Sequence, residues 1–211
     1  MGAAIAIDSR AIDSLLATRT IWHAGRSASA SLGDGEPTGH AALDALLPQA
    51  GWPRGALTEL LLPADGVGEL GLLLPTLARL TNAGDHVVLI APPYLVYAPA
   101  WQAAGVDLGA LDIVEAPARD ALWAFEQCLR SGACAAVVGW PQQADAQALR
   151  RLQVAADSGN CLGFAVRDHK HAGNPSPAAL RLLYAADSSR WHVRKCRGGP
   201  VPALGFAQAR H

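Results

Sequence analysis

The chain has 211 residues, 17 Lys and Arg against 18 Asp and Glu, and a formal net charge of -1. This length fits one domain with a sizeable core plus tails, so a second independent domain would have to be small. A net charge near zero excludes a global field that steers the chain to nucleic acid or an anionic membrane, although a local patch can still do so. The four cysteines lie far apart without a C-x-x-C pair, which favours reduced core residues over a disulfide framework or a zinc site.

The first 39 residues lack the pattern of a packed domain. The N-terminus has no basic region and its apolar run is too short for a signal peptide or a membrane span, so we expect a cytoplasmic protein. Residues 1–24 form an expected arm with a short amphipathic helix between Ser9 and Thr20. Residues 25–39 are small, polar and rich in glycine, which predicts a flexible linker before a core over residues 40–211. Trp22 follows the helix, either as an interface anchor or packed back on its own core.

Beyond His40, apolar runs of strand length alternate with helical patterns, as is typical of crossover units that feed a parallel sheet. The continuous apolar character of the runs fits strands covered on both faces. We expect strands at 57–62, 86–91, 113–115, 135–139 and 162–166, and helices at 71–80, 121–129 and 144–156. Pro75 should kink the first helix or mark a late start.

The last part of the core changes to alternating apolar and polar residues. Two such segments follow Pro177 and are separated by a polar turn at 187–189, which predicts a terminal antiparallel hairpin. The expected fold class is therefore α/β, with a mostly parallel central sheet and a C-terminal antiparallel extension.

The segment between the first strand and the first helix has the context of a phosphate-binding loop without its chemistry. Such a loop holds the anion with backbone N–H groups, supplies charge with a lysine and ligates magnesium with a hydroxyl. Gly66 and Gly68 are present, but Glu69 stands at the lysine position and Leu70 at the hydroxyl position. A carboxylate there repels a triphosphate by an energy on the order of several kcal/mol. The sequence predicts a degenerate loop in which the two glycines form a tight turn.

The other parts of a nucleotide-hydrolysing site are also missing. The strand at 135–139 runs into Trp140 and Pro141 with no magnesium-holding carboxylate, and the strand at 86–91 leads to Pro92, Pro93 and Tyr94 in place of an acidic residue. The histidines lack H-x-x-x-H or H-E-x-x-H spacing, which argues against a metal site. We therefore expect no catalytic residue, cofactor or metal. An enzyme would require a second subunit to supply nucleotide-binding residues.

The predicted hairpin carries positive charge along its last strand and exit. Arg190, Arg194, Lys195 and Arg197 lie there with Trp191 among them. A cationic strand with a stacking aromatic could follow a single-stranded DNA backbone or contact a protein partner. The alternative is a solvated edge strand whose charges discourage addition of another strand.

Short motifs in a fixed order carry a family resemblance. Residues 43–167 resemble the core of bacterial RecA recombinases. Within that superfamily, TGH at 38–40, GWP at 51–53 and GEL at 68–70 most resemble the ImuA family of RecA-like accessory proteins. LRSGAC at 129–134 and RGGP at 197–200 are further points of similarity.

The resemblance implies a RecA-like three-layer sandwich and a role in SOS-induced translesion DNA synthesis. ImuA proteins act with ImuB, an inactive relative of Y-family polymerases, and with an error-prone DnaE-type polymerase. This chain would then be a mutasome adaptor, associated with the nucleoid when active, with RecA as a further candidate partner. The alternative is the related cell-division inhibitor SulA, which sequesters the tubulin-like protein FtsZ. Direct DNA contact and self-association stay open.

Overall fold

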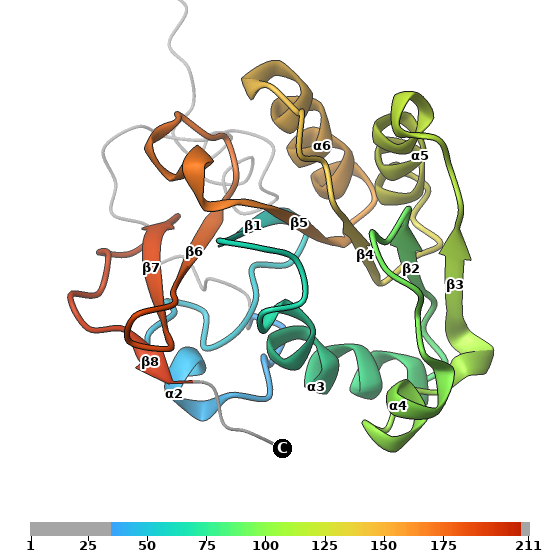
Figure 1. The fold of residues 1–211 in the computed structure, drawn as a ribbon, viewed down its shortest axis with the longest axis horizontal. Coiled ribbons are helices and arrows are strands. Elements are labelled where there is room, and N and C mark those ends of the chain that lie inside the picture. Colours follow the sequence, from blue (N-terminus) through green and yellow to red (C-terminus); the bar gives the residue numbers. More distant parts are fainter. Residues whose placement is uncertain (1–34, 208–211) are drawn as a thin grey trace, which may run out of the picture. The chain divides into compact units, whose positions relative to one another are not determined.

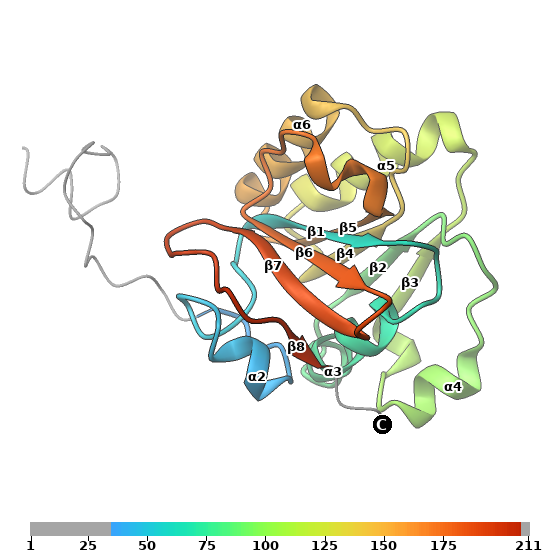
Figure 2. The ribbon, with the colours of Figure 1, turned by 60° about the vertical axis from the view of Figure 1, so that its left-hand side comes forward.

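A single mixed sheet organises residues 35–207, which are the residues that the computed structural model describes (Figure 1, Figure 2). The sheet has eight strands in the order β3-β2-β4-β5-β1-β6-β7-β8. Their bounds are β1 Ala56–Leu62, β2 Val87–Ile90, β3 Leu111–Val114, β4 Ala136–Gly139, β5 Leu162–Asp168, β6 Leu180–Ala185, β7 Arg190–Cys196 and β8 Phe206–Ala207.

Strands β1 to β6 all run in the same direction. The pairs β1–β5, β1–β6, β2–β3, β2–β4 and β4–β5 are parallel, whereas β6–β7 and β7–β8 are antiparallel. Every residue of β1, β2 and β4 is buried, because a parallel sheet is covered on both faces. The predicted α/β class, with a mostly parallel sheet and a terminal antiparallel hairpin, is confirmed.

Helices cover both faces of the sheet. Their bounds are α2 Ala41–Asp44, α3 Glu69–Asn82, α4 Ala98–Ala103, α5 Ala118–Arg130 and α6 Ala146–Ser158, with short 3-10 turns η1 Leu108–Ala110 and η2 His169–Gly173. Figure 1 shows α5 and α6 side by side on one face and α3 with α4 on the other. Alternate residues of β1 serve the two layers, since Leu60 packs in the cluster of α3 and Leu57 in the cluster of α5 and α6. That the layers follow a specifically RecA-like plan stays a prediction.

The five strands and three helices expected for the central part are all present, with ends displaced by a few residues. Helix α3 begins at Glu69 and contains Pro75, so the alternative of a late start is wrong. Helix α4 and the 3-10 turns were not predicted, because segments this short carry no full amphipathic period.

The predicted arm and the first part of the linker, residues 1–34, lie outside the described residues. Residues 35–39, which the sequence pattern places in the linker, pack on the core. Glu36 and Trp52 exchange two backbone hydrogen bonds of 2.9 and 2.7 Å. The Glu36 side chain is 3% exposed and ion-paired with Arg54 and Arg79. The core therefore includes a polar segment that its composition could not identify, because ion pairs and hydrogen bonds rather than apolar side chains hold it.

A buried carboxylate joins the middle of the sheet. Glu59 of β1 is fully buried, and its oxygens accept hydrogen bonds from Arg167 Nη1 on β5 at 2.8 Å and Arg181 Nε on β6 at 2.7 Å. The remaining guanidinium N–H groups donate to carbonyl oxygens of residues 141, 144, 171, 172 and 174. The three side chains therefore connect β1 to both neighbouring strands and to the loops beyond them.

We predict that Glu59→Gln lowers the free energy of unfolding by about 3–5 kcal/mol, because it leaves two buried guanidinium groups without a counter-charge. Urea denaturation measures the loss. The exposed Asp120, ion-paired with Arg119, provides a matched control, and Asp120→Asn should change stability by less than about 1 kcal/mol. Equal small effects of the two substitutions would contradict the central role of Glu59.

Candidate functional site

The segment from Pro63 to Gly68 connects β1 to α3 at the carboxyl end of the parallel strands. In parallel α/β sheets this end commonly holds ligands. Gly66 has a φ of 80° and Gly68 a φ of 144°, backbone conformations that L side chains rarely adopt. Both glycines are therefore needed to turn the chain from the end of β1 into the first turn of α3.

The carboxylate of Glu69 folds back into this loop. It accepts hydrogen bonds from the backbone N–H of Gly66 at 2.7 Å and of Gly68 at 3.2 Å. Tyr94, which follows β2, donates its hydroxyl to the same carboxylate at 3.4 Å. The Glu69 side chain is fully buried. The loop thus points its N–H groups at an anion, as a phosphate-binding loop does, but the anion belongs to the chain itself.

This arrangement defines what the loop can do chemically. An incoming phosphate would have to displace a buried carboxylate and would be repelled by it at short range. Leu70, at the position of the missing hydroxyl, is half-buried and packs against the core. The sequence shows a negative charge at Glu69 where a lysine is expected, but it does not show that the Glu69 carboxylate turns back into the loop. It also missed Tyr94 as a partner, for which the one available signal is that β2 ends at the same edge of the sheet.

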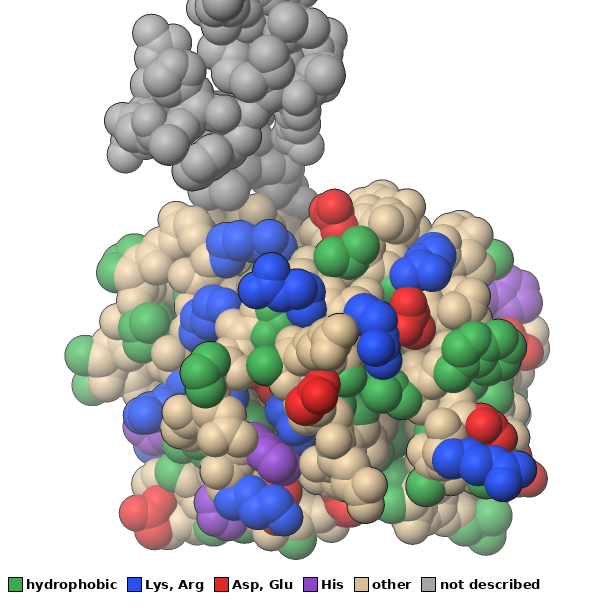
Figure 3. Space-filling model, turned by 90° about the horizontal axis from the view of Figure 1, so that it is seen from above, with side chains coloured by type: hydrophobic (Ala, Val, Ile, Leu, Met, Phe, Trp, Pro, Cys, Tyr) green, Lys and Arg blue, Asp and Glu red, His purple; other side chains and the backbone are tan. Residues whose placement is uncertain are grey.

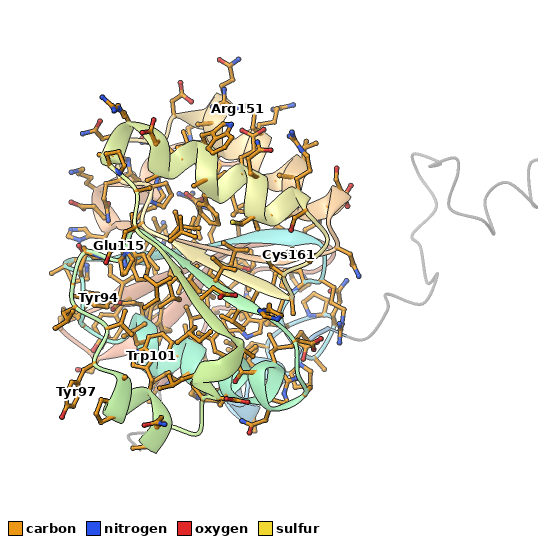
Figure 4. The ribbon with its side chains drawn as sticks, turned by 90° about the vertical axis from the view of Figure 1, so that its right-hand side faces the viewer. Tyr94, Tyr97, Trp101, Glu115, Arg151 and Cys161 are labelled. Carbon is orange, nitrogen blue, oxygen red and sulfur yellow. The ribbon has the colours of Figure 1, made fainter. Side chains whose placement is uncertain are left out.

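The charge of Glu69 affects its neighbours. Burial, and then the negative charge and hydrogen bond of Glu69, raise the pKa of Tyr94 strongly, so its hydroxyl stays a donor. Burial also raises the pKa of Asp65, with further contributions from the charges of Glu69 and Asp168. The Tyr94 ring packs edge-on against Trp140 with centroids 5.6 Å apart. Figure 4 shows Tyr94 at the edge of the sheet and Tyr97 pointing away from it.

Gln142 links the loop to the end of β5. Its amide nitrogen lies 3.5 Å from Asp65 Oδ1, and its amide oxygen accepts the backbone N–H of Asp168 at 2.9 Å. The pKa of Asp168 is lowered, first by the backbone N–H and then by the side chain of Lys170. Gln142 therefore ties the loop at Asp65 to the end of β5, where Asp168 is ion-paired with Lys170.

The basic residues of the hairpin form a separate group on β7 and at the residue after it, two strand positions from β1 in the sheet. Arg190, Arg194 and Arg197 are exposed, and Arg190 donates to the Gly205 carbonyl oxygen. Lys195 donates to the Ser176 carbonyl oxygen at 2.7 Å. Burial, followed by the charges of Arg181 and Arg197, lowers the pKa of Lys195.

Trp191 lies on the inner face of β7 and is fully buried. The centroid of its ring lies 5.2 Å from that of the Tyr184 ring. The prediction that Trp191 stacks on a base or anchors a partner is therefore wrong for this fold, because strand alternation turns its side chain into the core beside Val193. Trp22, the other predicted aromatic contact, lies outside the described residues.

No helix within residues 35–207 is long and apolar enough to cross a membrane.

Comparisons with known proteins place the loop within a recognised segment. The family model described as "Cell division inhibitor SulA" matches residues 55–163, which include β1, the loop and α3. Two curated relatives named "Protein ImuA", from Caulobacter vibrioides strains NA1000 / CB15N and ATCC 19089 / CIP 103742 / CB 15, are each 26% identical over 185 residues. Each alignment covers 84% of this chain and 73% of the relative. The crystal structure of SulA from Pseudomonas aeruginosa is 26% identical, covers 52% of this chain and 96% of that chain, and has a TM-score of 0.45.

We predict that Glu69→Ala lowers the free energy of unfolding by about 1–3 kcal/mol, because the N–H groups of Gly66 and Gly68 lose their acceptor. Glu115 is an exposed carboxylate beyond β3, and Glu115→Ala should change stability by no more than about 0.5 kcal/mol. Urea denaturation of both variants makes the comparison. An unchanged midpoint for Glu69→Ala would show that the loop does not depend on its internal carboxylate.

A second prediction concerns pH. Because folding raises the pKa of Asp65 above its ordinary value of 3.8, the protonated form is favoured in the folded state. The contribution of Asp65 to the free energy of unfolding is therefore fully present below pH 3.8, and it is lost as the pH rises through the pKa of Asp65 in the folded state. Asp65→Asn removes this loss, so the variant should be more stable than wild type at neutral pH. The difference should vanish in acid, as measured by thermal unfolding across pH, and a pH-independent difference would rule out a titration effect.

Proposed function

We propose that this chain, which belongs to the family described as cell division inhibitor SulA and is similar to ImuA proteins, is a non-catalytic, RecA-like adaptor in SOS mutagenesis. In this role it binds ImuB and an error-prone DnaE-type polymerase during translesion DNA synthesis. The similarity to ImuA supports this choice, since it spans 84% of the chain, whereas the SulA model matches residues 55–163. The ImuA alignment therefore covers more of the chain than the segment from β1 to β5 that the SulA model matches.

The observation that carries the proposal is the position of the Glu69 carboxylate. It occupies the N–H groups of Gly66 and Gly68 that a nucleotide phosphate would need. The ends of the neighbouring strands support the same conclusion, because β2 leads to Pro92 and β4 to Trp140, and neither supplies a carboxylate for magnesium. The strand, loop and helix then serve as a scaffold, and function depends on the outer surface.

The surface offers side chains suited to protein contacts. Leu95 is 92% exposed, Tyr97 65% and Trp123 66%. Large apolar side chains left in water are common anchors of protein interfaces. They support a function in binding partners.

One observation favours a second candidate function. The family model that matches β1 to the start of β5 describes a cell division inhibitor. On this alternative the chain binds FtsZ and blocks division after DNA damage, and the closed loop would again serve as a scaffold.

Binding to purified ImuB and FtsZ, measured side by side by isothermal titration calorimetry, tests the proposal. We predict saturable binding to ImuB and none to FtsZ. Addition of the chain should also leave FtsZ assembly, followed by light scattering, unchanged. Binding to FtsZ without ImuB would replace the proposal with its alternative, and binding to neither would refute both.

A further inference from the structure

Trp123 differs from the other tryptophans that the structure describes. Its side chain is 66% exposed, whereas Trp52 and Trp191 are fully buried and Trp101 is 4% exposed. Trp123 lies in the middle of α5, a regular helix that is well packed on its other face by Phe125 and Leu129. A large aromatic side chain at a fixed position in water is a candidate anchor for a partner.

The neighbours of Trp123 along α5 are charged. Arg119, Trp123, Glu126 and Arg130 follow one another at intervals of four, three and four residues, so they lie on one face of the helix. Helix α6 lies beside α5 (Figure 1). Both helices connect parallel strands of one sheet, so they run in the same direction.

An ion-pair network joins the two helices at the centre of this surface. Glu126 accepts hydrogen bonds from Arg130 Nη2 at 2.7 Å and from Arg151 Nε of α6 at 3.2 Å. The Glu126 side chain is 14% exposed, while those of Arg130 and Arg151 are 48% and 51% exposed. The carboxylate thus lies beneath two guanidinium groups, which it orients while their outer N–H groups face solvent.

On this surface the arginines, Arg119, Arg130, Arg150 and Arg151, outnumber the carboxylates of Asp120 and Glu126 with which three of them pair. Arg119 is 84% exposed and pairs with the exposed Asp120. Arg150 is exposed, and its side chain makes no hydrogen bond or ion pair within residues 35–207. Figure 3 views this side of the molecule and shows Lys and Arg side chains spread over it, and Figure 4 shows Arg151 on the outer side of the helices, away from the sheet.

Apolar side chains lie on both sides of the network. Trp123 is one turn before Glu126 on α5, and Val154, which is 54% exposed, is one turn after Arg151 on α6. Since the helices run in the same direction, the order along the surface is apolar, cationic and apolar. We call the surface formed by Arg119, Trp123, Arg130, Arg150, Arg151 and Val154 the α5–α6 face.

We propose that the α5–α6 face docks an acidic segment of a protein partner, whose carboxylates meet the arginines and whose flanking apolar side chains cover Trp123 and Val154. This inference rests on the proposed adaptor function and adds the surface and the chemistry of the partner. Oriented guanidinium groups match carboxylates in bidentate geometry. Trp123 alone could stack on a base, but the exposed Val154 is an aliphatic side chain with no stacking face, and it favours a protein over a nucleic acid.

The test measures the affinity of full-length variants for purified ImuB. Trp123→Ala and Arg150→Glu should each weaken binding by about tenfold or more, because one removes the anchor and the other reverses an unpaired charge. Arg150→Glu should also reduce the salt dependence of the affinity. Neither residue supports the core, and circular dichroism verifies folding. Leu204, 78% exposed, lies elsewhere in the sequence, beyond β7, and Leu204→Ala is the matched control with unchanged affinity.

The outcomes separate the inference from the function on which it rests. Wild-type binding that both α5–α6 variants retain overturns the assigned surface and leaves the adaptor function standing. Absence of wild-type binding refutes the adaptor function and the surface with it. The wild-type protein and both variants are also titrated with a single-stranded thymidine oligonucleotide, which measures their binding to nucleic acid. If the two variants lose oligonucleotide binding but keep ImuB binding, the face serves nucleic acid and the inference is wrong.

Discussion

The buried carboxylate of Glu59 fixes the strands at the centre of the sheet. A charge without solvent must have counter-charges and hydrogen bonds, and Arg167 and Arg181 provide them from the two strands that flank β1. The same guanidinium groups hold carbonyl oxygens of the segments after β4 and β5. The carboxyl edge of the sheet is therefore fixed around the point where β1 ends, and this fixed edge positions the loop that leads into α3.

At the same edge, the buried carboxylate of Glu69 also has its hydrogen-bond donors within the chain. The turn into α3 presents N–H groups of Gly66 and Gly68, which in a nucleotide-binding loop await a phosphate. Here the first residue of the helix supplies the anion, and Tyr94 adds a third donor from the end of β2. A loop satisfied in this way needs no ligand for its shape. On the function proposed above, this segment serves as a scaffold and the outer faces, such as the α5–α6 face, bind partners.

The sequence predicted the α/β class of the fold because this class depends on local patterns. Apolar runs identified buried parallel strands, whereas the degenerate loop inferred from Glu69 at the lysine position stays a prediction. What the sequence could not supply depends on tertiary contacts. The contact of the Glu69 carboxylate with Tyr94 exists because β1 and β2, which are distant in the sequence, end at the same edge of the sheet. Strand alternation could have placed Trp191 inside, but the charges around it favoured a surface position. Glu36 is buried and ion-paired with Arg54 and Arg79, which are distant in the sequence, and the composition of the segment around Glu36 cannot show these pairs.

We expect the carboxylate of Glu69 to close the loop between β1 and α3 to nucleotides. Equilibrium binding of magnesium ATP to the purified wild-type protein, combined with a hydrolysis assay, tests this expectation. We predict no saturable binding and no turnover by the wild-type chain. We also predict no turnover by Glu69→Lys, because β2 and β4 still end without catalytic carboxylates. Saturable ATP binding with hydrolysis by the wild-type protein would show that the loop is open to nucleotides.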